Sequence, residues 1–224
     1  MSTDTAATGE FSLFAAWLAI IASIAVLILL ALLHILSPEF QPSWRMVSEY
    51  ANGKYSWVLS LMFLAWAVSS WALAFALRSQ VHTTAAKIGL VLLVAAGVGE
   101  AMASVFDINH RLHGLAALIG IGSLPIAAML ISVSLGRSEA WSASRTSLLW
   151  AANLTWVSVV LMAISFAILA TTFARSGADM TAGVPASLPP GVIGVVGWAN
   201  RFLIVMYCAW VTTVAWHAIK IVRP

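Results

Sequence analysis

The chain has little charge. Asp, Glu, Lys and Arg make up 8% of its 224 residues, whereas average protein sequences contain about 25%. A water-soluble domain of this size could not cover its surface with so few charges. The 11 Lys and Arg residues form no basic run and leave a net charge of +3, so nothing indicates a nucleic-acid partner. The one cysteine, Cys208, excludes an internal disulfide and a cysteine-based metal cluster.

Apolar residues are instead abundant, at 62% of the chain. Runs longer than about 18 apolar residues indicate membrane spans, which must be helical because lipid offers backbone groups no hydrogen-bond partner. We therefore predict an all-α, polytopic six-helix transmembrane bundle over residues 11–218. Residues 1–10 and 219–224 are predicted as short tails. The predicted spans are 11–36, 55–78, 86–106, 113–135, 147–173 and 191–218.

The basic residues predict the orientation of the spans. An even number of spans places both termini on one side, and short cytoplasmic loops carry an excess of Lys and Arg. The side that holds the termini carries Arg78, Lys87, Arg137, Arg145, Lys220 and Arg223, while the other carries Arg45, Lys54, Arg111 and Arg175. We therefore expect cytoplasmic termini.

Three segments then face outward: 37–54, 106–113 and 174–190. The last is rich in small residues, Pro and Gly, which favours a flexible loop or lid, with Pro189 and Pro190 at the start of the sixth helix. The first mixes charges with aromatic residues, which is typical of a short interfacial helix with its aromatics at headgroup depth. Such a helix could cover the bundle and bring Glu49 over His113.

Two charged residues lie deep within the predicted spans, away from their ends, where an ionisable group costs about 2.5–3.5 kcal/mol. Glu100 lies about 21 Å above the cytoplasmic end of the third span, and Arg201 about 15 Å below the outer end of the sixth. These depths allow an ion pair. Such a pair would either hold two helices together or place a functional charge in a cavity.

The junction between the third and fourth spans carries Asp107, His110 and His113, which repeat every three residues. One helical turn would bring them to one side, where they could bind a divalent metal or transfer a proton. This metal signal is weak because a fourth ligand is missing. Alternatively, Asp107 caps the fourth helix and His110 lies among the headgroups. No cofactor is identified, because His34 and His113 are not placed as the deep histidine pair of a b-type cytochrome.

Small residues recur at helical spacing in two of the spans. Their spacing predicts close contacts between helices, either within the chain or in a homo- or hetero-oligomer. The positions are Gly97 with Ala101, Gly99 with Ala103, and Gly191 with Gly194 and Gly197.

The chain resembles the bacterial membrane family called domain of unknown function 998. The resemblance rests on the run from His34 to Phe40, the Ser48-Glu49-Tyr50 element, the junction at Asp107 and His113, and an arginine early in the last span. It covers about residues 12–218 and implies a six-helix protein of the bacterial inner membrane. It implies no activity.

A looser resemblance is to the alkaline-ceramidase-type intramembrane hydrolases. These enzymes hold zinc with three histidines and have seven helices. In this chain the candidate zinc ligands would be Asp107, His110 and His113. The chain has six predicted spans, and it lacks the His-x-x-x-His pair that these enzymes carry late in the sequence.

Three functions follow as hypotheses. In the first, an outer-leaflet pocket binds a lipid headgroup, small solute or proton. An anionic ligand would suit Arg201 in this pocket, and a cationic ligand would suit its carboxylates. The second is a structural or accessory subunit, and the third a metal-dependent lipid hydrolase. Membrane lipids are expected partners in each case. The pocket is supported if its five candidate residues converge: Glu49, Glu100, Asp107, His113 and Arg201.

Overall fold

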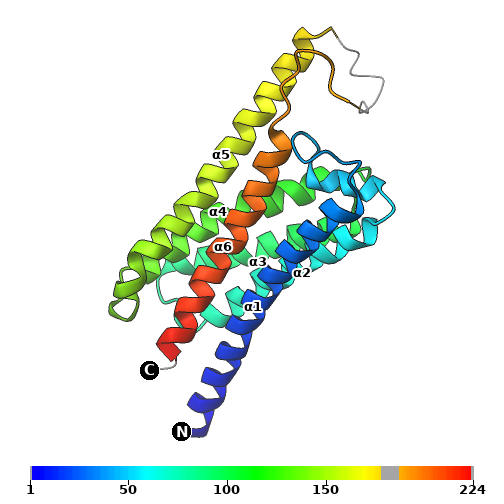
Figure 1. The fold of residues 1–224 in the computed structure, drawn as a ribbon. Helices are drawn as coiled ribbons and strands as arrows, with labels where there is room; N and C mark the ends of the chain where they lie inside the picture. Colours follow the sequence, from blue (N-terminus) through cyan, green and yellow to red (C-terminus); the bar gives the residue numbers. More distant parts are fainter. Residues whose placement is uncertain (1, 178–186, 223–224) are drawn as a thin grey trace.

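The computed structural model describes residues 2–177 and 187–222, and within these residues the chain is helical. The long helices are α1 (Ser2–Leu36), α2 (Ser56–Leu77), α3 (Thr84–Val105), α4 (His113–Leu135), α5 (Arg145–Arg175) and α6 (Val196–Val222) (Figure 1). Two short 3-10 helices, η1 (Val47–Asn52) and η2 (Glu139–Ser144), lie in the connections. Each long helix contains a segment long and apolar enough to cross a membrane. The predicted six-helix transmembrane bundle is therefore confirmed.

The helix limits agree with the predicted spans to within two residues for α2, α3, α4 and α5. Helix α1 begins earlier than predicted, at Ser2, so residues 2–10 continue the helix rather than forming a separate tail. Helix α6 begins later, at Val196, because the chain turns at Gly191 with a φ of 82°. That left-handed conformation suits glycine and does not continue a helix. Pro189 and Pro190 therefore precede a turn and not the first turn of α6.

The six helices form a ring in chain order. Each helix packs against the next one along the sequence, α6 packs back against α1, and α2 also contacts α6. Helix α1 begins and α6 ends at the same end of the bundle, while η1 lies at the other end (Figure 1). We call the latter the η1 end.

Local sequence explains several helix ends. Thr83 caps α3 by accepting a hydrogen bond from the backbone N–H of Ala86 at 3.2 Å. Helix α5 ends where Gly177 takes a φ of 69°, the left-handed conformation common after helices. Most of the predicted flexible loop 174–190 lies outside the described residues, which omit 178–186.

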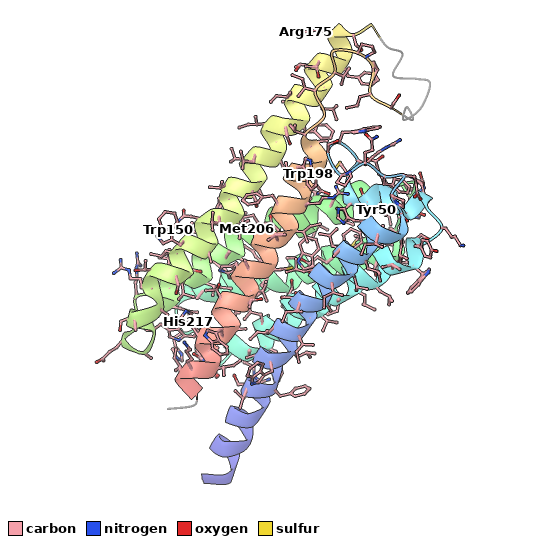
Figure 2. All side chains as sticks on the ribbon, in the orientation of Figure 1. Tyr50, Trp150, Arg175, Trp198, Met206 and His217 are labelled. Atoms are coloured by element: carbon pink, nitrogen blue, oxygen red, sulfur yellow. The ribbon has the colours of Figure 1, made fainter. Side chains whose placement is uncertain are left out.

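The outer surface of the bundle is apolar, as lipid contact requires. Trp150 on α5 is 67% exposed and Trp198 on α6 is 56% exposed, and Trp150 points away from the bundle in Figure 2. Helix α5 has the smallest buried share of the six candidate spans, at 11%. Its last turns extend past the neighbouring helices at the η1 end (Figure 1).

The segment 37–54 contains the predicted short helix, η1. Two of its aromatic residues, Trp44 and Tyr50, are buried within the end of the bundle. Hydrogen bonds from α6 hold the segment there. Arg201 donates to the Arg45 carbonyl at 2.7 Å, and the Val47 N–H donates to Asn200 at 2.9 Å.

Candidate functional site

A cavity of about 80 Å³ lies inside the ring of helices toward the η1 end. Its walls come from α2, α3, α4 and α6, and the segment 46–48 closes it at the η1 end. We call it the Glu100 cavity. Most of its lining is apolar, and its polar or aromatic lining residues are Ser48, Phe63, Trp66, Glu100, His113, Asn200 and Tyr207.

Glu100 is the one acidic residue of this lining, and its side chain is buried, with 4% of the residue exposed. Ser70 on α2 donates a hydrogen bond to Oε2 of Glu100 at 2.8 Å. The second oxygen, Oε1, is buried and has no hydrogen-bond partner. Among the described residues Glu100 forms no ion pair, so an ionised carboxylate here would lack the compensation that buried charges require.

Trp66 lines the same cavity and offers a hydrogen-bond donor, whereas Glu100 offers an acceptor. Its indole N–H is a hydrogen-bond donor, and Nε1 is buried without a partner. Most buried polar atoms in proteins are paired, so an unpaired one calls for an explanation. Here an unpaired acceptor and an unpaired donor belong to side chains that line one cavity. This combination suits an occupant that both donates and accepts hydrogen bonds.

Close packing of α3 and α4 forms one wall. A methyl group added at Gly99 would lie 2.4 Å from the Gly120 nitrogen and 2.7 Å from the Ala116 carbonyl oxygen. The two backbones can therefore approach only because residue 99 is glycine. Glu100 follows immediately on α3, so this contact fixes the helix that presents the carboxyl group to the cavity.

A second wall depends on a proline. Pro125 lies inside α4 and has no N–H, so the carbonyl of Ile121 loses its partner within the helix. The Tyr207 hydroxyl on α6 donates to that carbonyl at 2.7 Å. This bond ties α6 to α4 across the Glu100 cavity and satisfies a backbone group that would otherwise be orphaned.

His113, the first residue of α4, lines two cavities. One is the Glu100 cavity, and the other is a more polar cavity of about 140 Å³, which we call the His113 vestibule. Asp107 and Ser104 line the vestibule, and Ser48 and Phe63 line both cavities. The Nδ1 atom of His113 lies 2.9 Å from the Phe106 carbonyl oxygen. As a carbonyl only accepts, Nδ1 carries a proton and donates it.

Arg201 lies elsewhere, in a cluster of hydrogen bonds near the η1 end. Its Nε donates to Nε2 of His34 at 2.7 Å, and its other nitrogens donate to the carbonyls of Arg45 and Gly197 and to the Tyr50 hydroxyl. Nδ1 of His34 lies 2.6 Å from the Leu30 carbonyl. His34 thus donates through Nδ1 and accepts through Nε2, which is a neutral imidazole. Figure 2 shows Tyr50 at this end of the bundle. The cluster joins α1, α6 and the segment 37–54.

The predicted ion pair of Glu100 with Arg201 is not formed. Glu100 bonds to Ser70 on α2, whereas Arg201 bonds to His34 on α1 and to Tyr50 in the segment 37–54. Helix α3 packs between α2 and α4, while α6 packs mainly against α1 and α5. Depth along a helix can be estimated from sequence, but the direction in which the side chain points around the bundle cannot.

Glu49 also lies apart from the Glu100 cavity. Its carboxylate forms an ion pair with Arg45 at 2.7 Å and accepts a hydrogen bond from the Met46 N–H at 2.7 Å, closing the first turn of η1. In the segment that was expected to bring Glu49 over His113, Ser48 faces the vestibule instead. The five candidate residues therefore do not line a single cavity. Glu100, His113 and Asp107 follow one another through two adjoining cavities.

The histidine-containing junction does not form a metal site. Among the described residues, no three His, Cys, Asp or Glu side chains are placed to hold a metal ion. His110 is exposed and stacks on Phe106 with ring centroids 4.5 Å apart. Asp107 accepts from the Asn109 N–H within a turn. It does not cap α4, which has Leu112 at that position.

The predicted small-residue contacts between helices are formed by Gly97 and Gly99 on α3, whereas Gly191 and Gly194 precede α6, and Gly194 and Gly197 pack against the segment 37–54. A methyl group at Gly97 would meet the Trp71 ring, and one at Gly197 would lie 2.4 Å from the Pro42 carbonyl oxygen. Gly194 packs in the same way against Trp44 and Leu188. Gly191, by contrast, has open space around it and serves the turn before α6.

Several residues of the site were not predicted. Ser70, Trp66 and Tyr207 carry no motif, because their importance arises from which helix faces meet. Pro125 gave a usable signal, since a proline within a span frees a carbonyl that needs a donor from another helix. His34 gave a weaker signal, because an imidazole near the end of the first span also needs a hydrogen-bond partner.

The sequence was compared with known proteins. Residues 20–217 match a family described as "Protein of unknown function (DUF998)". The chain belongs to this family. The match covers α2 to α5 entirely, about half of α1 (residues 20–36) and most of α6 (residues 196–217). No curated protein and no solved structure matches the chain. The family has no assigned function, and the six long apolar helices fit an integral membrane protein.

Proposed function

We propose that the protein binds a small protonated amine, which also carries a hydrogen-bond acceptor such as a hydroxyl group, in the Glu100 cavity. The observation that carries this proposal is the pair of unpartnered buried atoms that belong to one lining, Oε1 of Glu100 and Nε1 of Trp66. An ammonium group would donate to the carboxylate. The hydroxyl oxygen would accept from the indole N–H.

The cationic character of the ligand follows from the carboxyl group and its surroundings. A carboxylate buried among apolar side chains needs a counter-charge, and the described residues supply no ion pair to Glu100. The aromatic residues Phe63, Trp66 and Tyr207 line the same cavity. Aromatic faces attract ammonium groups, by about 2 kcal/mol or more where water is excluded. Carboxylate and rings together favour a cation over a neutral solute.

The size of the ligand follows from the cavity. A volume of about 80 Å³ is roughly half of the 150 Å³ cavity that holds benzene. We therefore expect a ligand with only a few non-hydrogen atoms, such as ethanolamine. The His113 vestibule, with Asp107 in its lining, offers a polar path from the η1 end. The excess of Lys and Arg at the opposite end favours an extracytoplasmic η1 end, so the ligand would arrive from outside the cell.

The experiment uses Cys208, which is the only cysteine and is 1% exposed. A fluorogenic maleimide should react with it only when the purified protein unfolds in lipid nanodiscs. Because a ligand that binds only the folded state stabilises it, ethanolamine should raise the unfolding temperature. Ethylamine, which lacks the acceptor, should raise it less, and ethylene glycol, which lacks the cation, should have no effect.

Two variants test the site itself. Glu100→Gln retains the shape but removes the negative charge, and should strongly reduce the stabilisation by ethanolamine. Trp66→Phe removes the indole N–H, and should make ethanolamine no better than ethylamine. Glu139→Gln, at an exposed position in η2, removes a carboxylate far from the cavity and serves as the control. Equal stabilisation of Glu100→Gln and wild type would refute the proposal and favour a purely structural role for Glu100.

A further inference from the structure

A large groove lies on the outside of the bundle at the η1 end, separate from the Glu100 cavity. It has a volume of about 570 Å³ and is bounded by the last turns of α5, the segment 37–54 that contains η1, and the α3–α4 connection. This volume is within the range of about 300–1,000 Å³ that is usual for small-molecule sites. We call it the α5 groove. Met46 lines both the groove and the Glu100 cavity.

The wall formed by α5 is apolar. Phe166, Leu169 and Phe173 repeat at helical spacing and line the groove, and Phe166 is 53% exposed. The other exposed residues of α5 between Trp156 and Ala170, such as Ile164 at 51%, are also apolar. The groove therefore continues a helix surface that is built for contact with lipid chains.

The opposite wall is polar and carries balanced charge. Arg45 and Glu49 are the charged residues of the described lining, and they are paired at 2.7 Å. Beside them, the Asn109 amide donates to the Asn52 side-chain oxygen at 2.8 Å. One positive and one negative group lie at this wall, with an apolar wall across from them.

We propose that the α5 groove binds a phospholipid with a zwitterionic headgroup, taken from the surrounding bilayer. An acyl chain would lie along the α5 wall, the phosphate would lie near Arg45, and the headgroup amine near Glu49. An anionic lipid would bring a phosphate without an amine, which matches only half of this pair. The proposal is independent of the amine proposed for the Glu100 cavity, because the groove contains neither Glu100 nor Trp66.

The first test fills the groove. Ala170 lines the groove, whereas Ala167 lies on the same helix, is likewise exposed and is outside the lining. The variants Ala170→Trp and Ala167→Trp should therefore insert equally well and differ in lipid binding. Native mass spectrometry of protein released from mixed micelles should show bound phosphatidylethanolamine on wild type and Ala167→Trp, with loss on Ala170→Trp. Equal retention by the two variants would overturn the proposal.

The second test changes the charge. Wild type is given an equal mixture of phosphatidylethanolamine and phosphatidylglycerol with identical chains, and should retain mainly the former. Glu49→Gln keeps the shape of the side chain but leaves Arg45 as the charged group of the described lining, so the retained lipid should shift to phosphatidylglycerol. Glu139→Gln serves as the matched control and should keep the wild-type preference. An unchanged lipid ratio in Glu49→Gln would contradict the proposed headgroup recognition.

Discussion

Replacing Gly99 by alanine should destabilise the bundle more than any other single methyl group added to the facing surfaces of α3 and α4. The added Cβ would lie 2.4 Å from the Gly120 nitrogen and 2.9 Å from its Cα. Ordinary carbon contacts lie at about 3.5–4.0 Å, so the two helices would have to separate by about 1 Å. The obstructing atoms are backbone atoms, which cannot rotate away as a side chain can.

The magnitude follows from two opposing terms. Overpacking typically costs about 1–3 kcal/mol, and backbone obstruction places this site at the upper end. Alanine also favours the helix over glycine by up to about 1 kcal/mol. We therefore expect Gly99→Ala to lower the free energy of unfolding by about 2 kcal/mol.

The same helix pair supplies matched controls. A methyl group at Gly120 would meet its nearest atom at 3.6 Å, and one at Gly122 would meet nothing within 4 Å. Gly120→Ala should therefore change stability by less than about 1 kcal/mol, and Gly122→Ala should be neutral or slightly stabilising. Unfolding in detergent with increasing SDS, followed through the reactivity of Cys208, measures all three. If Gly99→Ala is as stable as Gly122→Ala, the close α3–α4 contact is wrong.

Three further predictions concern the contacts that hold the site and the orientation of the chain. Tyr207→Phe should lower the free energy of unfolding by about 1–3 kcal/mol, because it leaves a buried α4 carbonyl unpaired. Adding Pro125→Ala should recover stability, since alanine restores an N–H for that carbonyl. If the double variant recovers nothing, Tyr207 does not serve as the partner of the freed carbonyl. Arg201→Gln should lower the free energy of unfolding by at least about 3 kcal/mol, because it removes charged hydrogen bonds. Arg201→Lys should be destabilised as well, since lysine lacks the planar guanidinium that bonds several acceptors at once. The reactivity of the Cys208 thiol during unfolding measures both variants. In a cysteine-free background, an impermeant maleimide applied to intact cells should label Ser43→Cys and not Ser138→Cys, and the reverse pattern would invert the orientation.

The spans could be predicted from sequence because length and apolarity suffice to identify a transmembrane helix. The start of α6 could not, because residues 191–195 are as apolar as a span but contain Gly191 in a turn. Hydropathy measures transfer into lipid and carries no information about backbone conformation. The short helix η1 was predicted, but its burial depends on Arg201 and Asn200, which lie about 150 residues further along the chain.

The site was predictable only in part. The cost of burying a charge correctly singled out Glu100 and Arg201 as residues that need partners. The identity of those partners depends on which faces of the helices meet, and a single sequence does not contain that information. Thus Ser70 and His34 replaced the predicted ion pair. Glu49 was expected beside His113, but its carboxylate closes η1 and binds Arg45.

The central claim, that the Glu100 cavity binds a small hydroxylated amine, is tested most directly by equilibrium binding of isotopically labelled ethanolamine to the purified protein in nanodiscs. We predict saturable binding of one ligand per chain to wild type and to Glu139→Gln. Loss of one charge-assisted hydrogen bond should weaken binding to Glu100→Gln by about tenfold or more. Binding to Glu100→Gln with the wild-type affinity, or no saturable binding to the wild-type protein, would contradict the claim.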